Sequence, residues 1–577
     1  MTQDRKIDVI TMHLINNLLY SIVDEMTATV VRTSFSPLAR DAFDFQCALC
    51  TPKGEIILEG EGSLLHSLAY AGIIATIRKK YGDEIYLGDT FLNNDPYSEA
   101  AHLPDVYLTR PIFVDGELVA WSCSGGHQID VGGRVAGSCA CDSTEIYQEG
   151  LRLPPVRLYE RGVPVKDIFD ILKANSRVPE VLVGDILSHH AACNTGETRF
   201  LELVKTYGWE TFSMYITELL DYAERRTREE LTNLPDGSYE FTDYLDDDGF
   251  GEGPIPIHVK ITIDGDSITY DFTGSAPQIK GAMNNPIATT KGMVLIGLRL
   301  LLSYDIPRNG GVWRPVTLIA PKGSVLNPNL PGAVAARGLT LARLIDVMMG
   351  AEAQIVPDKM PACECGSDYL LCLSGRDEER GLTILVETVW GGWGGRPFAD
   401  GPEFNTPILL DGANQCCELN ERIYPVIYNQ YGYVPDTEGA GKYRGSLSLI
   451  REWEFVGDEG TLQIRVDRTR TRPWGLHGGH NGTFSQTILN PDSENRELGK
   501  VTLPCSKGDV LRLRTAGAGG WGDPLERDVD SVKADVRNEK ISIRRAREVY
   551  GVVIDKKTME VDLNETRKLR ETKRRVG

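Results

Sequence analysis

Residues 102–130 read HLPDVYLTRPIFVDGELVAWSCSGGHQID, a stretch in which two short polar motifs enclose a β-hairpin. Val106–Val114 and Glu117–Ser124 are rich in residues that favour β-strands, and Asp115-Gly116 lies between them. A type I′ turn needs a positive φ at both central residues, so Asp-Gly in this position is a strong signal for a two-residue hairpin. The stretch therefore predicts two antiparallel strands.

The turn also predicts which residues face each other across the hairpin. If Val114 faces Glu117 and the pairing continues without interruption, His127 lies opposite Pro104. Directly opposed residues lie about 4.5–5.5 Å apart, so side chains that are distant in the sequence meet at the open end of the hairpin. The residues expected to cluster there are His102, Asp105 and His127.

Two imidazoles and a carboxylate are ligands that divalent metal ions prefer. The alternative is a polar hairpin end whose histidines lie in solvent. The segment after the first predicted helix adds Asp41, Asp44 and His66 as further candidates. A site of two histidines and two carboxylates suits Mn²⁺, Fe²⁺ or Zn²⁺, and composition does not choose among them. Asp130 is the candidate for holding an imidazole from outside the ligand shell.

The bulk composition argues against several classes of protein. The chain has 577 residues, 41% of them hydrophobic and 25% charged, which is ordinary for a globular protein; at roughly 150 residues per domain it suggests about three or four domains. A formal charge of −20 argues against nucleic acid or an anionic membrane as the main partner. Met1–Asp8 has no secretory character, and the apolar run Met293–Leu298 is too short to span a bilayer. We expect a cytoplasmic protein.

The cysteines do not form a disulfide framework in so long a chain. Cys47-x-x-Cys50, Cys363-x-Cys365 and Cys416-Cys417 each lack a properly spaced second pair, so no structural zinc site is predicted. Buried, reduced thiols are the interpretation that we adopt. Cys123 lies close to His127 and could form a Cys–His nucleophile, but its position within a strand favours a packing role.

The pattern along the chain predicts an α+β protein of several domains, with mixed helices and antiparallel sheets. Ile7–Val31 has apolar residues at helical spacing, Leu234–Ser238 is a turn signal at a domain boundary, and Gly265-Asp266 predicts a second hairpin. The predicted segments are an N-terminal α+β domain with the metal site (1–235), a central α/β domain (236–430), a β-rich domain (431–525) and a helical C-terminal tail (526–577).

The sequence contains neither a convincing nucleotide-binding motif nor a serine-nucleophile motif. Tyr443 follows Gly441-Lys442, and Asp436 stands where a P-loop requires its first glycine. No Gly-x-Gly-x-x-Gly opens a helix within a βαβ unit, and no Gly-x-Ser-x-Gly elbow occurs. If the reaction uses ATP, we expect another chain to bind it.

Two glycine clusters, Gly391–Gly395 and Gly517–Gly520, allow two interpretations. Their backbone N–H groups could approach an anion. Glycine-dense loops more often turn tightly, and that is the structure we expect at both clusters.

Several motifs resemble those of the hydantoinase B/oxoprolinase family. Asn93–Tyr97 followed by His102–Asp105 is similar to the family's NDPY…THLPD signature, and His127–Gly133 is similar to its HHADIGG signature. Further stretches resemble the family in the expected order: Thr144–Arg161, Asp271–Gly274, Pro435–Gly445, Pro473–Gly479, Gly517–Pro524 and Tyr550–Val553. The resemblance covers roughly residues 6 to 555.

The resemblance implies one half of a two-subunit enzyme. Family members are B-type subunits of ATP-dependent hydrolases of cyclic amides, namely hydantoins, 5-oxoproline or lactams, and they work with a separate ATP-binding A-type subunit of actin-like fold. It therefore implies a hydantoinase B-like fold, a hetero-oligomer, and ATP bound to the partner. Carried over by motif, the metal ligands are Asp44, His102, Asp105 and His127, and Asp41 competes with Asp44 for its place.

On this basis we expect the partner to phosphorylate the amide oxygen, while His66 acts as a nearby acid or base and Asp130 orients a ligand. The alternative function is an ATP-dependent ketone carboxylase of the acetone or acetophenone type, whose alpha subunits are related. A scaffold subunit without chemistry and a metal-dependent hydrolase that acts alone are two further alternatives.

Three departures from the family pattern surround the expected ligands. Glu99-Ala100-Ala101 stands where the family has Gly-Gly-Thr, Gln128 replaces the second histidine of the His-His pair, and Ile129 replaces a small residue. The expected ligand set is intact, but its surroundings differ, so the sequence leaves the substrate open.

Overall fold

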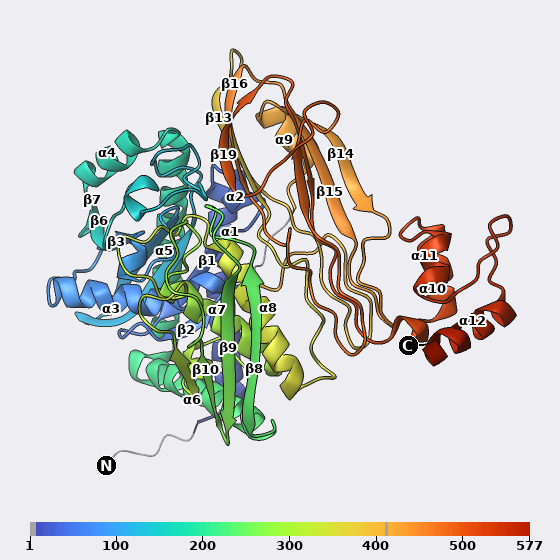
Figure 1. Ribbon diagram of the computed structural model, residues 1–577. Helices are drawn as coiled ribbons and strands as arrows, with labels where there is room; N and C mark the ends of the chain where they lie inside the picture. The colour runs from blue at the N-terminus through green and yellow to red at the C-terminus, as the bar shows by residue number, and fades with distance from the viewer. Residues whose placement is uncertain (1–6, 410–413, 577) are drawn as a thin grey trace. The chain divides into compact units, whose positions relative to one another are not determined.

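The computed structural model describes residues 7–409 and 414–576, which divide into two compact units (Figure 1). The first unit comprises residues 1–240, 259–337 and 409–412, and the second comprises 241–258, 338–408 and 413–577. Each unit thus contains segments that are distant in the sequence. The division into four consecutive domains stays a prediction, because the two compact units are defined by contacts in space and do not correspond to continuous stretches of the chain.

The first unit is built on a seven-stranded antiparallel sheet in the order β2-β1-β5-β4-β3-β6-β7, with the hairpin strand β4 at its centre and β5 beside it. Its strands are β1 (Phe45–Cys50), β2 (Ile56–Glu59), β3 (Thr90–Asn93), β4 (Asp105–Val114), β5 (Glu117–His127), β6 (Val156–Glu160) and β7 (Val163–Pro164).

The predicted hairpin is present, with one correction to its register. Asp115 and Gly116 have φ values of 50° and 86°, as a type I′ turn requires. Val114 pairs with Glu117, but a β-bulge then shifts the pairing by one residue, and His127 lies opposite Asp105. The expectation that His127 faces Pro104 is therefore wrong, because Val119 is an extra residue in β5.

The physical reason for the bulge lies in the core. Val119 and Ala120 both belong to the same hydrophobic cluster, which a regular strand could not achieve because its successive side chains point to opposite faces. The bulge lets both residues be buried. It also shifts by one residue the partner on β4 that each residue of β5 faces between the bulge and the open end of the hairpin.

Long helices cover the hydrophobic surface of the seven-stranded sheet. The predicted first helix is confirmed as α1, capped by the side chain of Asp8, and its buried face includes Ile15, Leu19 and Met26. Helix α5 packs on β4 and β5. The helices of this unit are α1 (Val9–Thr33), α2 (Pro37–Arg40), α3 (Ala69–Tyr81), α4 (Lys166–Asn175), α5 (Pro179–Tyr207), α6 (Trp209–Thr232) and α7 (Ile287–Leu301), with short 3₁₀ helices η1 (Leu64–His66), η2 (Pro96–Ser98), η3 (Ile146–Gln148) and η4 (Gly310–Trp313).

A four-stranded sheet has the order β11-β10-β9-β8. Its strands are β8 (Gly237–Leu245), β9 (Ile255–Asp264), β10 (Ser267–Asp271) and β11 (Val316–Ile319). Gly265 has a φ of 58° between β9 and β10, so the second predicted hairpin is confirmed. Strands β10 and β11 run parallel, an exception to the otherwise antiparallel pairing.

The second unit contains helix α8 (Gly338–Ile355) and two antiparallel sheets that share one hydrophobic core. One sheet has the order β13-β12-β16-β19 and the other the order β14-β15-β20-β17-β18. The strands are β12 (Leu370–Asp377), β13 (Gly381–Thr388), β14 (Val426–Val434), β15 (Ser448–Phe455), β16 (Glu459–Arg465), β17 (Gln486–Leu489), β18 (Arg496–Glu497), β19 (Val501–Ser506) and β20 (Val510–Arg514), and α9 (Cys417–Ile423) precedes β14.

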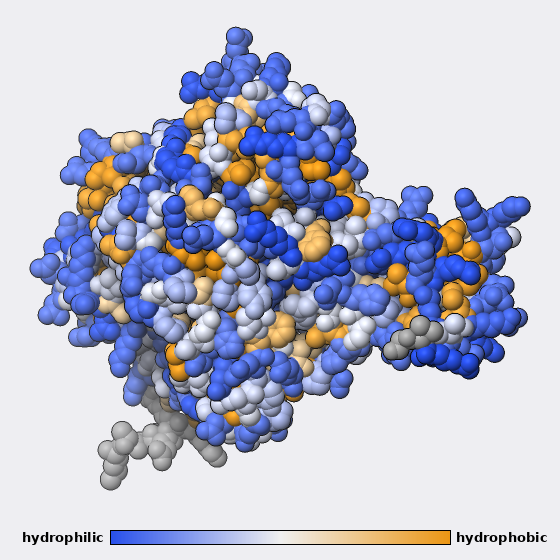
Figure 2. All heavy atoms as spheres, viewed as in Figure 1, coloured by the Kyte–Doolittle hydropathy of each residue, from blue (hydrophilic) through white to orange (hydrophobic). Residues whose placement is uncertain are grey.

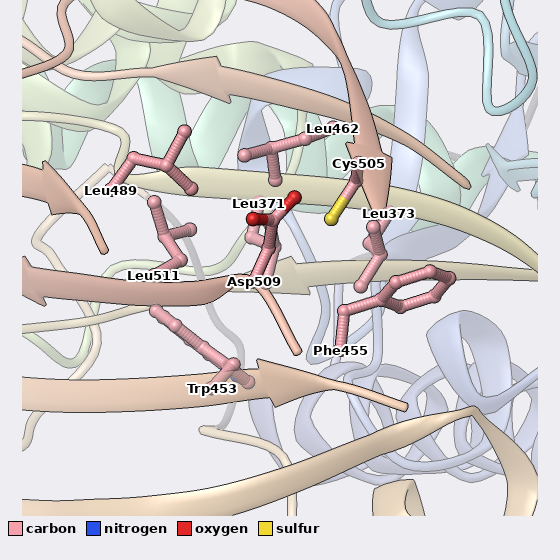
Figure 3. Close-up of a pocket in the computed structure, with 9 residues that line it drawn as sticks. All are labelled: Leu371, Leu373, Trp453, Phe455, Leu462, Leu489, Cys505, Asp509 and Leu511. Carbon is pink, nitrogen blue, oxygen red and sulfur yellow. The ribbon is translucent and has the colours of Figure 1, made fainter. Parts of the chain in front are cut away.

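A small apolar cavity of about 10 Å³ lies between these two sheets (Figure 3). Leucine side chains such as Leu371 and Leu511 line it from opposite sheets, and Asp509 also lines it. The Asp509 carboxylate accepts hydrogen bonds from the side chain of Asn490 and the backbone of Ser506. The cavity is a packing gap of the core, with room for no more than one water molecule.

The two glycine clusters do not form the tight turns that we expected. None of the glycines in 391–395 or 517–520 has a left-handed φ. Instead their segments lie against other glycine-rich segments and exchange backbone hydrogen bonds, for example from Gly439 N to Ala518 O at 2.8 Å and from Gly395 N to Gly519 O at 2.9 Å. The glycines are needed because a Cβ at these positions would collide with neighbouring backbone.

The C-terminal tail forms the short helix η5 (Pro524–Glu526) and the helices α10 (Val529–Arg537), α11 (Ile543–Glu548) and α12 (Leu563–Val576). Basic residues of α12 bind their own chain: Arg570 donates to the carbonyl oxygens of Tyr550 and Arg527, and Lys573 donates to that of Glu548. The basic end of the sequence therefore helps to dock the last helix on the module formed by residues 524–554.

Hydrophilic residues cover most of the visible face, and apolar residues appear there in scattered patches (Figure 2). Among the residues that the structure describes, no helix combines the length and apolar character needed to cross a membrane.

Replacing Gly517 with Ala is expected to destabilise the second unit by about 1–3 kcal/mol or more, because the new Cβ would overlap the carbonyl oxygen of Thr437. Gly499→Ala is the control, since its Cβ meets nothing within 4 Å. Urea unfolding of both variants measures the difference. Equal stability of the two variants would contradict the close packing of the glycine segments.

Candidate metal centre

The candidate centre lies at the open end of the hairpin, where the pairing of β4 with β5 brings its residues together. Asp105 begins β4, His127 ends β5, and the bulged register places them directly opposite each other. His102 lies in the turn before β4, whose backbone closes with a hydrogen bond of 2.9 Å from Asp105 N to His102 O. The predicted cluster of His102, Asp105 and His127 is therefore present.

Three possible ligand atoms converge in this cluster. His102 Nε2 lies 3.1 Å from His127 Nδ1, and Asp105 Oδ1 lies 3.2 Å from the former and 3.3 Å from the latter. Metal–nitrogen bonds of about 2.1 Å separate neighbouring ligand atoms by roughly 3.0–3.4 Å in octahedral or tetrahedral geometry. The spacing is thus that of one face of a coordination polyhedron. The side chains of His102, Asp105 and His127 are 3%, 1% and 6% exposed.

The hydrogen bonds around the cluster show which atoms are free to bind a cation. His102 Nδ1 lies 3.2 Å from the carbonyl oxygen of Ala335, which can only accept, so the proton sits on Nδ1 and the lone pair on Nε2. Asp105 Oδ1 accepts no well-aligned hydrogen bond from the described part of the chain. Buried lone pairs that face one another are costly unless a cation lies between them, so the residues fit a divalent metal ion.

Without a metal, burial and neighbouring charges shift the titration of all three groups. Burial lowers the pKa of His102 to about 3. Burial opposes ionisation of Asp105, but His102 and Arg337 outweigh it and hold the pKa of that carboxyl well below its usual value. Burial also disfavours a charged His127, yet the nearby carboxylate of Asp105 and thiol of Cys139 raise its pKa to about 10. His127 is therefore protonated when no metal is bound, and its positive charge replaces that of a bound cation.

Of the two candidate carboxylates upstream, Asp44 is the one that the structure brings to the cluster. Its Oδ2 lies 3.9 Å from His127 Nδ1, and its backbone oxygen accepts a hydrogen bond of 3.0 Å from His127 N. Its side chain is 26% exposed, so the cluster opens to solvent on this side. Asp41 instead forms a two-point ion pair with Arg40. The fourth ligand stays a prediction, and these contacts support Asp44.

His66 is fully buried beside this carboxylate. Its Nδ1 lies 2.6 Å from the hydroxyl of Tyr107, and its Nε2 lies 3.5 Å from Asp44 Oδ1. Burial raises the pKa of Tyr107 well above its usual value, so the phenol keeps its proton and can donate it to Nδ1. The ring proton of His66 then lies on Nε2 and faces Asp44. This arrangement favours a donor that holds Asp44, while the predicted acid–base role of His66 stays a prediction.

Asp130 is buried in the loop after the hairpin. It accepts hydrogen bonds from the backbone of Gly137 and Arg177 and forms an ion pair of 3.0 Å with the Arg177 guanidinium. These bonds stabilise the loop, and the predicted role of Asp130 in orienting an imidazole stays a prediction. Cys123, considered above as a nucleophile, is buried, and burial raises the pKa of its thiol, which favours the packing role.

Sequence reasoning missed three neighbours of the cluster. Arg337 donates to Asp105 Oδ2 across 232 residues of sequence, and no spacing pattern reveals such a contact. Tyr107 reaches His66, and the alternation along β4 could have shown that it shares a face with Asp105. The thiol of Cys139 contacts His127, so a soft donor is present beside the cluster.

The fold is that of one known class of protein. The chain belongs to the hydantoinase B/oxoprolinase family, which matches residues 8–524. It is similar to the putative D-/L-hydantoinase B subunit of a Pseudomonas species (strain NS671), with 32% identity over 99% of each chain. It is also similar to the beta subunit of the caprolactamase of Pseudomonas jessenii, with 31% identity over 95% of this chain and 97% of that one.

Solved structures confirm the expected fold. The crystal structure of the ATP-dependent caprolactamase from Pseudomonas jessenii matches with a TM-score of 0.92 and 29% identity, over 98% of this chain and 100% of that one. A nucleotide-free acetone carboxylase matches with a TM-score of 0.91 and 18% identity, over 98% of this chain and 83% of that one. The second likeness concerns the fold alone.

Replacing Asp44 with Ala is expected to weaken metal binding by about 10-fold or more, because a carboxylate next to His127 would be lost. Asp41→Ala is the control, since Asp41 pairs with Arg40. Titration of each variant with Zn²⁺ and Mn²⁺ against a chromophoric chelator measures the affinity. A loss confined to Asp41→Ala would assign the fourth position to Asp41.

Proposed function

We propose that this chain is the metal-bearing B-type component of an ATP-dependent hydrolase of cyclic amides, with His102, Asp105, His127 and Asp44 as its metal ligands. The convergence of three buried donor atoms within 3.1–3.3 Å of one another carries the proposal. A divalent ion bound there would polarise an amide or phosphoryl oxygen or lower the pKa of a water molecule.

The exposure of the surrounding side chains supports one route for a substrate into this site. His66, His102, Asp105 and His127 have side chains that are at most 6% exposed, whereas that of Asp44 is 26% exposed. We infer that the reacting group enters past Asp44. The buried side of the site excludes water, which strengthens electrostatic interactions with a developing negative charge.

The nucleotide chemistry belongs to a partner in this proposal. The sequence has no P-loop, and the names of the two Pseudomonas relatives each designate one subunit of a larger enzyme. An A-type partner would transfer the γ-phosphoryl group of ATP to the amide oxygen, releasing ADP. Water would then add to the activated carbon at the site described here and the ring C–N bond would break, which leaves an acyl phosphate. A second water molecule would hydrolyse this acyl phosphate to the carboxylate and inorganic phosphate. Activation is needed because an amide carbon is a poor electrophile.

The test supplies the chain together with an A-type partner, ATP and one cyclic amide at a time: hydantoin, 5-oxoproline or caprolactam. We expect ring opening that depends on both ATP and metal, and we expect His127→Ala to abolish it together with metal binding. His13→Ala, an exposed histidine on α1, is the control. Full activity of a metal-free chain would refute the proposal, and carbon fixation from bicarbonate without ring opening would favour ketone carboxylation.

Replacing Tyr107 with Phe is expected to lower kcat by about 10-fold or more without changing metal content, because His66 Nδ1 loses its donor. Tyr70→Phe is the matched control: this neighbouring buried tyrosine packs edge-on against Tyr107 and donates to the carbonyl oxygen of Gln46. Steady-state kinetics and metal analysis separate the two effects. An unchanged kcat in Tyr107→Phe would show that the proton position on His66 is unimportant.

A further inference from the structure

A loop more than 200 residues away in sequence contacts the candidate centre on its buried side. It consists of residues Ala333–Arg337, which we name the clamp loop, and it ends where α8 begins. We propose that Glu149 holds the clamp loop in place and that the loop in turn orients His102 and Asp105 for metal binding. This inference rests on the metal site proposed above and makes Glu149 a positioning residue for it.

The first contact of the clamp loop selects the tautomer of His102. The carbonyl oxygen of Ala335 lies 3.2 Å from His102 Nδ1, so the ring proton is placed there and Nε2 keeps its lone pair. Nε2 is the atom that faces His127 and Asp105. A backbone carbonyl on the far nitrogen is a common way of fixing a histidine ligand.

The second contact orients Asp105. The guanidinium of Arg337 binds Asp105 Oδ2, and both side chains are almost completely buried, at 7% and 1% exposure. This pairing satisfies one carboxylate oxygen and leaves Oδ1 facing the two ring nitrogens. Asp105 can therefore bind a metal through one oxygen, in a direction that Arg337 sets.

Glu149 anchors the loop that makes both contacts. Its Oε1 accepts hydrogen bonds from the backbone N–H groups of Val334 at 2.8 Å and Ala335 at 2.9 Å. The residue is 3% exposed and follows η3 in the stretch TEIYQEG. Two further hydrogen bonds support the loop, from Ala336 N to Ala282 O at 2.8 Å and from the side-chain amide of Asn284 to Ala333 O at 3.0 Å.

The interaction with Glu149 requires an oxygen acceptor. Burial raises the pKa of Glu149 well above its usual value, which disfavours a charge on this side chain. A glutamine at this position has the same shape and the same carbonyl acceptor. The two substitutions Glu149→Gln and Glu149→Ala therefore separate an intact anchor from a lost one.

The experiment measures the affinity of the full-length chain for Zn²⁺ by competition with a chromophoric chelator. We expect Glu149→Gln to bind within about 3-fold of the unaltered chain and Glu149→Ala to bind about 10–100-fold more weakly. Tyr147→Ala, an exposed residue of the same stretch, is the control and should bind normally. Circular dichroism and the thermal midpoint confirm that each variant is folded.

A second variant tests the same inference without touching Glu149. Arg337→Gln should weaken Zn²⁺ binding about 10–100-fold and should change the visible spectrum of bound Co²⁺, because Asp105 loses the partner that directs its Oδ1. This result supports the inference even if Glu149→Ala does not fold.

Three outcomes would overturn the inference. Normal Zn²⁺ affinity in folded Glu149→Ala would show that the loop needs no anchor, and normal affinity with an unchanged Co²⁺ spectrum in Arg337→Gln would show that the loop does not orient Asp105. Equal loss in Glu149→Gln and Glu149→Ala would contradict the acceptor role. Failure of the unaltered chain to bind Zn²⁺ would refute the proposed function as well, whereas the first three results leave it standing.

Discussion

A one-residue bulge in β5 is the constraint on which the rest of the candidate centre depends. Without it, β4 and β5 would pair in the register that the Asp-Gly turn begins, and Asp105 would face Gly126. With it, Asp105 faces His127 at the open end of the hairpin, and their side chains meet. The bulge is stabilised far from the centre, by burial of both Val119 and Ala120 against the helices. Hydrophobic packing at one end of the hairpin thus determines polar geometry at the other.

The polar geometry is maintained because every neighbour constrains one atom of the cluster. The carbonyl oxygen of Ala335 accepts a hydrogen bond from Nδ1 of His102, and Arg337 donates to Oδ2 of Asp105. His66 directs its ring proton toward Asp44. What remains is a set of possible ligand atoms that converge in a buried space. A cation would relieve the repulsion between them, and the cluster opens to solvent only on the side of Asp44.

The second unit is held together in part by close packing of main chains. Its glycine-rich segments lie so close that a single Cβ would collide with neighbouring backbone, and hydrogen bonds between main chains take the place of side-chain packing. Beside them, two sheets share a conventional hydrophobic core. Glycine clusters that resemble anion-binding loops in sequence are here a requirement of packing, because main chains that lie this close leave no room for side chains.

The sequence by itself determined the local elements and the composition of the candidate centre. The long first helix, both hairpin turns and the mixed α+β class follow from hydrophobic period and turn chemistry, which depend only on residues close in the chain. The same reasoning brought His102, Asp105 and His127 together, because a two-residue turn imposes its pairing over a short distance, and the family resemblance added Asp44. Only the tertiary structure decided the register, through a bulge that serves the core, and the contacts of Arg337, Glu149 and Tyr107. Contacts between residues far apart in the chain leave no periodic signal in a single sequence, since they arise from how whole elements pack and not from the order of neighbouring residues.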